Sequence, residues 1–407
     1  MTMKDKAAIV GIGQTERYRR GASLPKSMMD MAIEATLLAL KDAALTVEDL
    51  DGFAFYGGAP ADPGAMAYLM GVPHVKFAAT LTAGGSGAAG SVGMAAAVIN
   101  AGLANVCVSL FVLQQVPTGR FGGSSEGPRQ IPAARGGGAY GGGGNVSPEA
   151  AFTAPAGVIS PGHNFSMLAQ RHMYQYGTKR EHFAEVCISQ RNNAMKRPQS
   201  MRQTPLTLED YFAARMISDP LCLFDYTMEC DGAIAVITTS TERARDLPHT
   251  PVLISGSGIG GTGDNAHLLG NFQMPDISFA SAGARDVAKQ MYAMAEVGPQ
   301  DVDVALLYDH FSPMVLMQLE DFQFCPIGES GPFVAEGNIR FGTGSIPVNT
   351  HGGNLSDFYC PGMTHLVEGV EQLRGTAINQ VEGAEIALCT GGPSSIPMTG
   401  TILKKDR

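Results

Sequence analysis

Val47-Glu-Asp-Leu-Asp-Gly-Phe-Ala-Phe-Tyr56 decides the fold, because the second half of the chain repeats it as Pro299-Gln-Asp-Val-Asp-Val-Ala-Leu-Leu-Tyr308. The two stretches align without a gap. A helical pattern of similar length precedes each of them, and before that comes an apolar strand that ends in Gly-x-Gly. After each stretch follow a Gly-rich turn, a helix and a buried strand. The pattern therefore predicts two similar β-α-β-α-β halves.

The helices and strands on either side of the repeat have clear sequence signals. A helix is expected over 27–44, with Met28, Met31, Ala32, Ala35, Leu38 and Ala39 on one face. Buried strands are expected at 105–113 and 384–390. Met363–Arg374 has apolar residues at helical spacing, and Gly375 ends it.

The amino-acid composition of the chain changes between about residues 117 and 225, where Gly- and Pro-rich runs precede helices of mixed charge. We interpret this segment as an insertion that carries loops over the active site. The N-terminal half is then 1–116 plus 226–248, and the C-terminal half is 249–407. The glycine runs at 135–147 fit a flexible linker equally well.

Composition limits the function classes. Hydrophobic residues make up 44% of the 407 residues and charged residues 16%, as in a globular protein. Twenty-eight basic and 38 acidic residues give 28 − 38 = −10, which argues against a general nucleic-acid binder but leaves room for a local basic patch. Seven cysteines without a CxxC pair indicate neither a disulfide framework nor a zinc site. With no signal peptide and no apolar run near ~18 residues, we expect a cytoplasmic protein that does not enter membranes.

The stretch Pro347–Gly362 is the candidate active-site loop. Its paired glycines at 352 and 353 allow a close backbone approach, and it is dense in hydrogen-bonding groups: Asn349, His351, Asn354, Asp357 and Tyr359. Taken alone it could be an ordinary glycine-rich surface loop. In a repeated fold, however, loops from both halves meet at the carboxyl ends of the strands. We therefore expect it to meet Tyr308, the 82–90 turn and Cys389-Thr-Gly-Gly392.

These segments together resemble the thiolase superfamily, and within it the sterol-carrier and lipid-transfer type of thiolase-like protein. The resemblance covers nearly the whole chain. It implies an α/β thiolase fold, with two pseudo-symmetric halves in an αβαβα arrangement and a loop-domain insertion. It rests on 9–16 (IVGIGQTE), 219–221 with 230–233, 308–311 (YDHF), 349–353 (NTHGG), 372–375 (QLRG) and 389–392 (CTGG).

The chain departs from thiolases at the catalytic positions. The thiolase nucleophilic Cys falls on Gly84 or Gly85, with only Ser86 nearby, so the usual acyl-enzyme cannot form. The thiolase His-Pro pair falls on Tyr359 and Cys360, and the other catalytic loop carries Tyr308. Two tyrosines at these places are similar to the steroid side-chain aldolases of the superfamily. Those enzymes cleave a 3-hydroxyacyl-CoA by retro-aldol reaction into a ketone and a short acyl-CoA.

The resemblance implies roles for the other site residues. Tyr308 and Tyr359 would move the protons, and Asp309, His310 or His351 would tune them. The backbone N–H of Gly391 would complete the oxyanion hole, and Cys389 is either a proton donor or a buried strand-end cysteine. Gly353, Asn349, Ser86 and His310 would contact the substrate. No metal or cofactor is expected, with coenzyme A only as part of the substrate.

Two other functions remain open. The chain could be a thiolase or acyltransferase that uses Cys389 or Ser86, or a non-catalytic acyl-CoA-binding subunit. The resemblance also implies a homodimer, and we place its two-fold seam at 91–101 and 105–113. It further implies a small OB-fold partner, often with a zinc ribbon, in an α2β2 assembly.

Overall fold

The computed structural model describes residues 3–57, 62–81, 85, 87–115, 154–158, 160–261, 279–392 and 397–406. Within these residues ten strands are joined in one hydrogen-bonded sheet, in the order β10-β11-β12-β9-β1-β8-β5-β3-β4, with β2 also paired to β8. The strands are β1 (Ala7–Gln14), β2 (Tyr18–Arg19), β3 (Gly52–Tyr56), β4 (Phe77–Leu81), β5 (Val106–Leu113), β8 (Cys230–Ser240), β9 (Val252–Gly260), β10 (Val304–Leu306), β11 (Ile386–Gly391) and β12 (Met398–Lys405).

The strand order confirms the repeat. The series β3-β5-β8-β1 in one half is matched by β10-β11-β12-β9 in the other. β3 and β5 are parallel, as are β10 and β11, whereas the remaining neighbours within each series are antiparallel. The halves meet where β1 pairs with β9.

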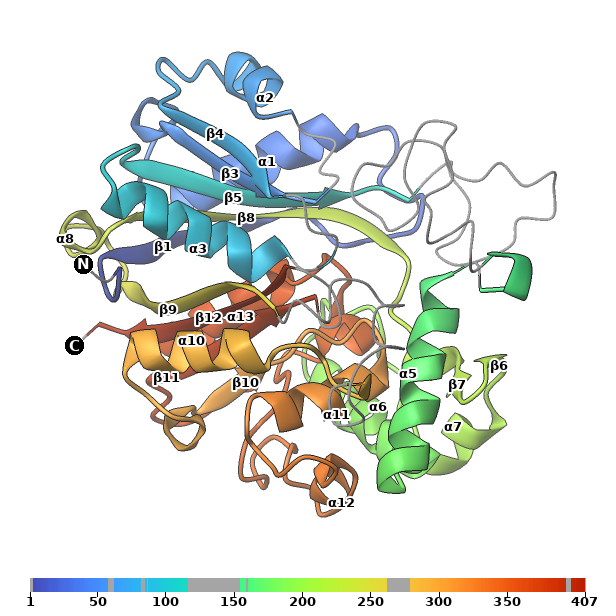
Figure 1. Ribbon diagram of the computed structural model, residues 1–407. Helices are drawn as coiled ribbons and strands as arrows, with labels where there is room; N and C mark the ends of the chain where they lie inside the picture. Colours follow the sequence, from blue (N-terminus) through green and yellow to red (C-terminus); the bar gives the residue numbers. More distant parts are fainter. Residues whose placement is uncertain are drawn as a thin grey trace.

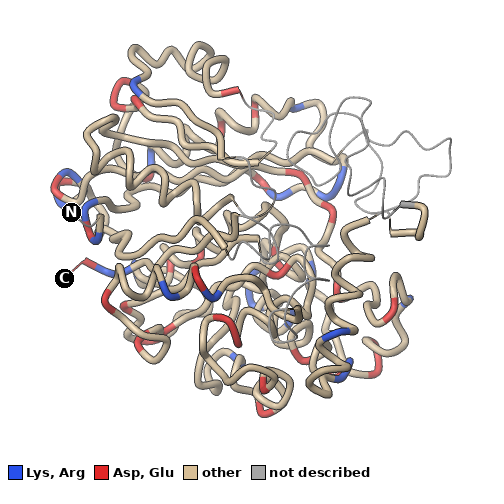
Figure 2. Tube along the Cα trace, in the orientation of Figure 1, with Lys and Arg blue, Asp and Glu red and all other residues tan. Residues whose placement is uncertain are grey.

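Helices separate and cover the two halves in layers (Figure 1). α1 covers the outer face of the first half and α10 that of the second, whereas α3 and α13 lie between the halves. This is the αβαβα arrangement expected. The strands and α3 are almost free of charged residues (Figure 2). α13 is not, since it contains Glu368, Glu371 and Arg374. The helices are α1 (Met28–Asp42), α2 (Pro63–Met70), α3 (Gly87–Asn100), α10 (Arg285–Ala295), α11 (Ser312–Asp321), α12 (Ser330–Ala335) and α13 (Met363–Arg374).

Two aspartates at matching places in the repeat set the start of the neighbouring strand. The Asp51 carboxylate accepts hydrogen bonds from the backbone N–H groups of residues 105 and 106, where β5 begins. Asp303 accepts from residues 385 and 386, where β11 begins. Each half therefore fixes its strand register with the same contact.

The Gly-x-Gly signal reflects close packing of a helix on a strand. A Cβ on Gly11 would lie 2.1 Å from the carbonyl oxygen of Ala39 in α1. A Cβ on Gly256 would lie 2.5 Å from the carbonyl oxygen of Met291 in α10. Only glycine permits this approach, so the repeated glycines mark the place where each outer helix touches its sheet.

The insertion contributes helices to one side of the molecule. Its described part contains α5 (Pro161–Tyr176), α6 (Arg180–Ala194), α7 (Leu208–Ala213), β6 (Met216–Ser218) and β7 (Leu221–Cys222). α6 packs behind the candidate active-site loop, since Ala194 meets Gly352 and the Asn193 amide donates to the carbonyl oxygen of Asn349. The glycine runs at 135–147 lie outside the described residues.

One expectation was wrong in detail, and two elements were not predicted. The elements that were not predicted are β4, which ends the sheet among the described residues, and α2. The two-fold seam at 91–101 and 105–113 stays a prediction; within the chain β5 is paired with β8 and β3. On α1, Leu38 points outward and is 40% exposed, whereas Leu40 is buried instead.

Candidate functional site

Tyr308 follows β10 and is held firmly by its backbone. Its N–H donates to the Thr390 hydroxyl oxygen at 2.9 Å, and its carbonyl oxygen accepts from the Gln318 amide at 2.8 Å. The Thr390 hydroxyl in turn donates to Gln318 at 2.6 Å. This closed ring joins the end of β10, the end of β11 and α11. The side chain of Tyr308 is therefore placed by three elements at once.

The hydroxyl of Tyr308 fills the space in which a side chain at residue 85 would lie. A Cβ on Gly85 would be 2.0 Å from the Tyr308 hydroxyl oxygen and 2.6 Å from its Cζ. Gly85 is one of the two positions onto which the thiolase nucleophile falls. Ser86 and Gly84 lie outside the described residues. A side chain at residue 85 would therefore clash with Tyr308 in its present position.

Tyr359 lies on the facing loop, and a cysteine holds its backbone. The Tyr359 N–H donates to the Cys230 sulfur at 3.2 Å, and the Cys230 thiol donates to the Tyr359 carbonyl oxygen at 3.3 Å. Cys230 begins β8 and is fully buried. Tyr359 is itself only 8% exposed. This cysteine therefore positions a candidate catalytic residue.

The structure brings the two tyrosines together, and they perturb each other unequally. Each side chain contributes to the pKa of the other. Burial raises the pKa of Tyr308 well above its ordinary value, and the interaction with Tyr359 raises it further. Burial raises the pKa of Tyr359 to about 12, although the bond from Tyr308 lowers it. Tyr359 is thus the easier of the two to ionise, with Tyr308 as its donor.

Asp309 orders the loop around the paired glycines. Its carboxylate accepts from the backbone N–H groups of Asn354 at 2.9 Å and Leu355 at 3.1 Å, at the start of the π-helical turn 353–357. It also contacts His365 at 3.0 Å. These bonds occupy the carboxylate, so the geometry favours a positioning role.

His365 was missed by sequence reasoning. It is fully buried on α13, and its Nε2 lies 3.0 Å from Asp309 and 3.1 Å from the carbonyl oxygen of Leu307. Its ring is 6.0 Å from that of Tyr308. The signal available was its position at the start of the helix that follows the loop, but helical spacing alone does not show what a side chain touches.

Asn349 joins the two loops. Its side-chain oxygen accepts from the N–H of Leu307 and its amide donates to the Leu307 carbonyl oxygen, both at 2.8 Å. Its backbone has a φ of 47°, in the left-handed region that asparagine tolerates better than most residues. The side-chain amide of Asn349 is therefore bound to the backbone of Leu307. Gly353 has a similar constraint, because a Cβ there would lie 2.2 Å from Asp309.

The two predicted histidines differ in surroundings. His351 is fully buried, its ring is 4.8 Å from that of His365, and neither of its nitrogens has a hydrogen-bond partner among the described residues. Burial lowers its pKa well below the ordinary value. His310 is half-buried beside Tyr308, 5.1 Å between rings, and also contacts Phe165. Burial lowers the pKa of His310 to about 3, so its imidazole is neutral near pH 7.

Cys389 is buried in β11 below α13, and Gly391 ends the same strand. The Cys389 thiol donates to the carbonyl oxygen of His365 at 3.5 Å. Burial raises its pKa far above the ordinary value, so the surroundings disfavour a thiolate. All seven cysteines are free and buried, which agrees with the absence of a disulfide framework.

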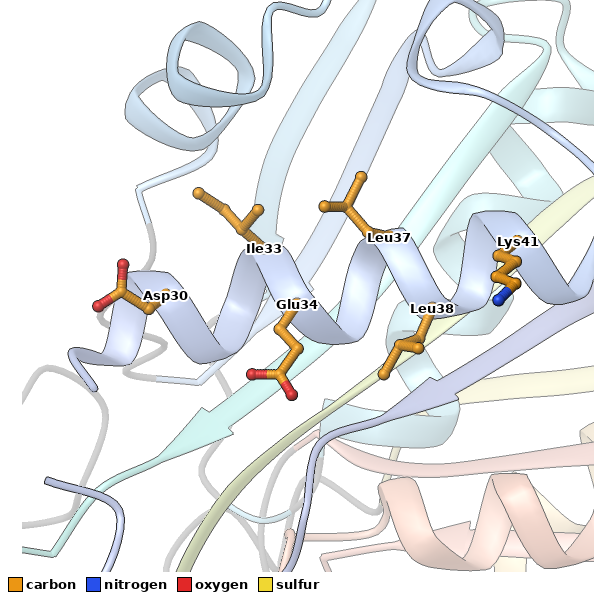
Figure 3. A pocket seen from close by; sticks show the side chains of 6 residues that line it. All are labelled: Asp30, Ile33, Glu34, Leu37, Leu38 and Lys41. Carbon is orange, nitrogen blue, oxygen red and sulfur yellow. The ribbon is translucent and has the colours of Figure 1, made fainter. Parts of the chain in front are cut away.

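Other possible sites are few among the described residues. No group of three or more His, Cys, Asp or Glu side chains there could hold a metal ion. None of the helices described is long and apolar enough to cross a bilayer. A shallow hollow on the outward face of α1 (Figure 3) contains no predicted site residue; it is lined by Asp30, Ile33, Glu34, Leu37, Leu38 and Lys41.

Known proteins resemble this chain over its full length. A family model described as "Thiolase C-terminal domain-like" matches residues 264–403. The steroid side-chain-cleaving aldolase of Thermomonospora curvata is 36% identical over 98% of both chains. The 17-hydroxy-3-oxo-4-pregnene-20-carboxyl-CoA lyase of Mycobacterium tuberculosis is 35% identical over 98% of this chain and 100% of that protein.

A solved structure agrees with these relatives. The Ltp2-ChsH2(DUF35) aldolase matches with a TM-score of 0.87 and 34% identity, over 100% of this chain and 99% of that one. The repeated halves and these relatives point the same way. The chain belongs to the thiolase-like family that includes the steroid side-chain-cleaving aldolases.

Proposed function

We propose that the chain is a carbon–carbon lyase that cleaves a 3-hydroxyacyl-CoA side chain, borne on a steroid, into a ketone and a short acyl-CoA. One observation carries the proposal. The Tyr308 hydroxyl lies where the side chain of a nucleophile at residue 85 would be, so a proton-transfer group replaces a covalent one. The similarity to two curated lyases over the full chain supports the same reaction.

The chemistry needs a base and an acid, and the pair supplies both. As the Cα–Cβ bond breaks, the β-hydroxyl loses its proton and becomes the ketone oxygen. The bonding electrons pass to Cα as a thioester enolate, which is then protonated to the short acyl-CoA. Tyr359, whose ionised form is stabilised by the bond from Tyr308, is assigned as the base. Tyr308 is assigned as the donor to the enolate.

The neighbours are assigned supporting roles. Neutral His310 beside Tyr308 faces the substrate as a hydrogen-bonding group, and the Gly391 N–H is assigned to the thioester oxygen. Asp309 and Asn349 position the loop through their backbone contacts. His351, with no partner for either ring nitrogen among the described residues, is assigned to the substrate side of the loop. No metal or cofactor is assigned a step.

The thiolase alternative is weaker on the geometry. Cys389 is enclosed by the core and its thiol is bound to the His365 carbonyl oxygen. The burial that raises its pKa opposes the thiolate that acyl transfer needs. This favours the lyase.

The test is product analysis with a 3-hydroxyacyl-CoA that carries a steroid ring system. The lyase releases a ketone and a short acyl-CoA in equal amounts without consuming free coenzyme A. Consumption of coenzyme A would identify a thiolase. Binding without any turnover, with or without a partner protein, would identify a non-catalytic subunit.

Assembly is also part of the proposal. Among the described residues β4 is the last strand of the sheet, and its residues alternate between half-buried and exposed, which suits pairing with a second copy across a two-fold axis. The Ltp2-ChsH2(DUF35) structure is named for two components. We therefore assign this chain a small OB-fold partner with a zinc ribbon, in an α2β2 complex in the cytoplasm. Light scattering and assays of the chain with and without that partner test both steps.

A further inference from the structure

His365 contacts the chain on both sides of Tyr308. Its Nε2 lies 3.1 Å from the carbonyl oxygen of Leu307 and 3.0 Å from the carboxylate of Asp309. These two residues come directly before and directly after the tyrosine. The imidazole ring itself is fully buried on α13. One side chain therefore holds the backbone before Tyr308 and the side chain after it.

The partners of His365 determine which ring nitrogen carries the hydrogen. The Leu307 carbonyl oxygen can only accept a hydrogen bond. The Asp309 carboxylate already accepts from two backbone N–H groups, so it also acts as an acceptor here. Nε2 must therefore carry the hydrogen and share it between the two oxygens. Nδ1 lies 3.4 Å from the Thr364 hydroxyl, so a neutral ring with its hydrogen on Nε2 satisfies all three contacts.

Asp309 extends this contact to the loop that carries Tyr359. Its carboxylate accepts from the two backbone N–H groups at the start of the π-helical turn 353–357. A Cβ on Gly353 would lie 2.2 Å from the carboxylate, so the turn packs directly on it. Tyr359 comes two residues after the turn. His365 is thus linked, through Asp309, to both of the loops that carry a tyrosine.

Two further rings pack near His365. The ring of His351 meets it edge-on, with 4.8 Å between the ring centroids, and the ring of Tyr308 lies 6.0 Å away. Both neighbours are buried. In a close-packed interior a ring cannot turn away from its acceptors unless its neighbours move too. Packing and hydrogen bonds therefore fix the orientation of His365 together.

We propose that His365 is a positioning residue that sets the geometry between the hydroxyls of Tyr308 and Tyr359. The inference rests on the proposed function, in which these two hydroxyls transfer the protons. Proton transfer needs heavy atoms within about 2.6–3.2 Å of each other, and a misplacement of about 1 Å can slow a reaction a hundredfold. The Nε2 of His365 is already bound to Leu307 and Asp309, so the residue acts through the tyrosines.

The first test removes the hydrogen-bond donor and then restores it. His365→Leu should lower kcat for a 3-hydroxyacyl-CoA about tenfold to a hundredfold, since the two loops lose their common support. KM should stay within about threefold, because the substrate contacts remain. His365→Gln should recover most of kcat, since its amide nitrogen is as many bonds from the backbone as the ring Nε2.

His172 supplies a matched control. It is also a buried histidine, 1% exposed, whose Nε2 lies 3.1 Å from a carboxylate, that of Glu320. It lies on α5 and belongs to no part of the candidate site. His172→Leu should lower the urea midpoint of unfolding as His365→Leu does, with kcat within about threefold of the wild type. Equal losses of kcat in the two variants would mean general destabilisation and would overturn the proposal.

A third variant keeps the test informative if His365→Leu does not fold. His365→Asn retains an amide, but its nitrogen is one bond too short to reach the two acceptors of Nε2. It should lose kcat as His365→Leu does, whereas His365→Gln should not. If the Asn and Gln variants have the same kcat, the position of the donor does not matter and the proposal fails.

A second readout needs no turnover. 3-Fluorotyrosine at position 359, in the purified chain and in its complex where one forms, reports the surroundings of that hydroxyl through its fluorine NMR resonance. His365→Leu should shift the resonance, and His365→Gln and His172→Leu should leave it in place. A shifted resonance in a chain without lyase activity would support the positioning role and refute the proposed function. An unshifted resonance in an active His365→Leu enzyme would overturn the positioning role and leave the lyase standing.

Discussion

Tyr56 and Tyr308 end the same stretch in the two halves of the molecule, yet they do different things. Each lies at the turn before the buried helix of the opposite half. Tyr56 donates its hydroxyl hydrogen bond to the carbonyl oxygen of Pro361, just before α13, and is fully buried. The Tyr308 hydroxyl lies against Gly85, just before α3, and faces Tyr359. The Tyr56 hydroxyl is bound to a backbone carbonyl, whereas the Tyr308 hydroxyl faces a second tyrosine. In the function we propose, the duplicated fold therefore uses one copy for structure and the other for chemistry.

The largest expected effect comes from removing the two hydroxyls separately. Tyr308→Phe should lower turnover by ~10²-fold or more, the usual scale for a general acid–base group, with the unfolding free energy nearly unchanged. Tyr56→Phe should do the reverse, because it leaves a buried carbonyl without a donor, at a cost of about 1–3 kcal/mol, while turnover stays within tenfold. Steady-state kinetics and urea unfolding of both variants give the two readouts. Equal losses of turnover would end the distinction between the halves.

Tyr359→Phe belongs to the same comparison. It should be as damaging as Tyr308→Phe, and the double variant should lose little more than either single one, because the pair acts as a unit.

The next largest effect tests the contact between the Tyr308 hydroxyl and Gly85 in the other half. Gly85→Ala should lower turnover about tenfold or more, since overpacking of this kind costs ~1–3 kcal/mol and must displace the Tyr308 hydroxyl. Gly260→Ala is the control, because a Cβ there meets nothing within 4 Å. Full activity of Gly85→Ala would show that Tyr308 need not lie where it does.

A smaller effect tests what the halves still share. Asp51→Ala and Asp303→Ala should each destabilise the protein by about 1–3 kcal/mol, because each leaves backbone donors at the start of a strand without their acceptor. Since they lie in different halves, their effects should add. Asp246→Ala, at an exposed position, serves as the control in urea unfolding. If only one of the two variants lost unfolding free energy, the other half would have to fix its strand register by different contacts.

The smallest effect concerns pH. His310 stands two residues after Tyr308, whereas the first half has glycine one and two residues after Tyr56. The pKa of His310 is lowered to about 3, so the unfolded chain binds a proton below about pH 6.5 that the folded chain does not. Its contribution to the unfolding free energy is present above pH 6.5 and is lost as pH falls towards 3. His310→Phe should make the decline between pH 7 and 4.5 shallower, and an unchanged slope would show that His310 is hydrated.

The sequence predicts most of the fold for physical reasons. Repeated spacing of apolar residues, Gly-x-Gly and Gly375 reflect local packing and backbone conformation. The helix Met363–Arg374 is therefore found at its predicted bounds, and the strand predicted at 105–113 is found at Val106–Leu113. β4 was missed because its sequence, Phe-Ala-Ala-Thr-Leu, does not alternate between apolar and polar residues, although the burial of its residues does alternate. Leu38 was placed inward because a 15-residue helix offers two adjoining apolar stripes.

The sequence could predict which residues belong to the candidate site, but it could not predict which of them are in contact. Tyr308 and Tyr359 could be chosen because they stand at departures from a known pattern. Cys230 and Tyr359, which bind each other, are 129 positions apart in the chain. Asp309 and His365, which also bind each other, are 56 positions apart. No local pattern encodes such pairs.

The contact between Gly85 and the Tyr308 hydroxyl also bears on how such a site can arise. The space at residue 85 holds either a nucleophile's side chain or this tyrosine's hydroxyl. In an ancestor with a cysteine at 85, gaining the tyrosine first would produce a clash, and losing the cysteine first would abolish acyl transfer before any replacement existed. A route between the two chemistries at this position would then need a gene copy free of selection, or an intermediate that binds its thioester without reacting. Sequences with a small residue at both positions would be the traces of that passage.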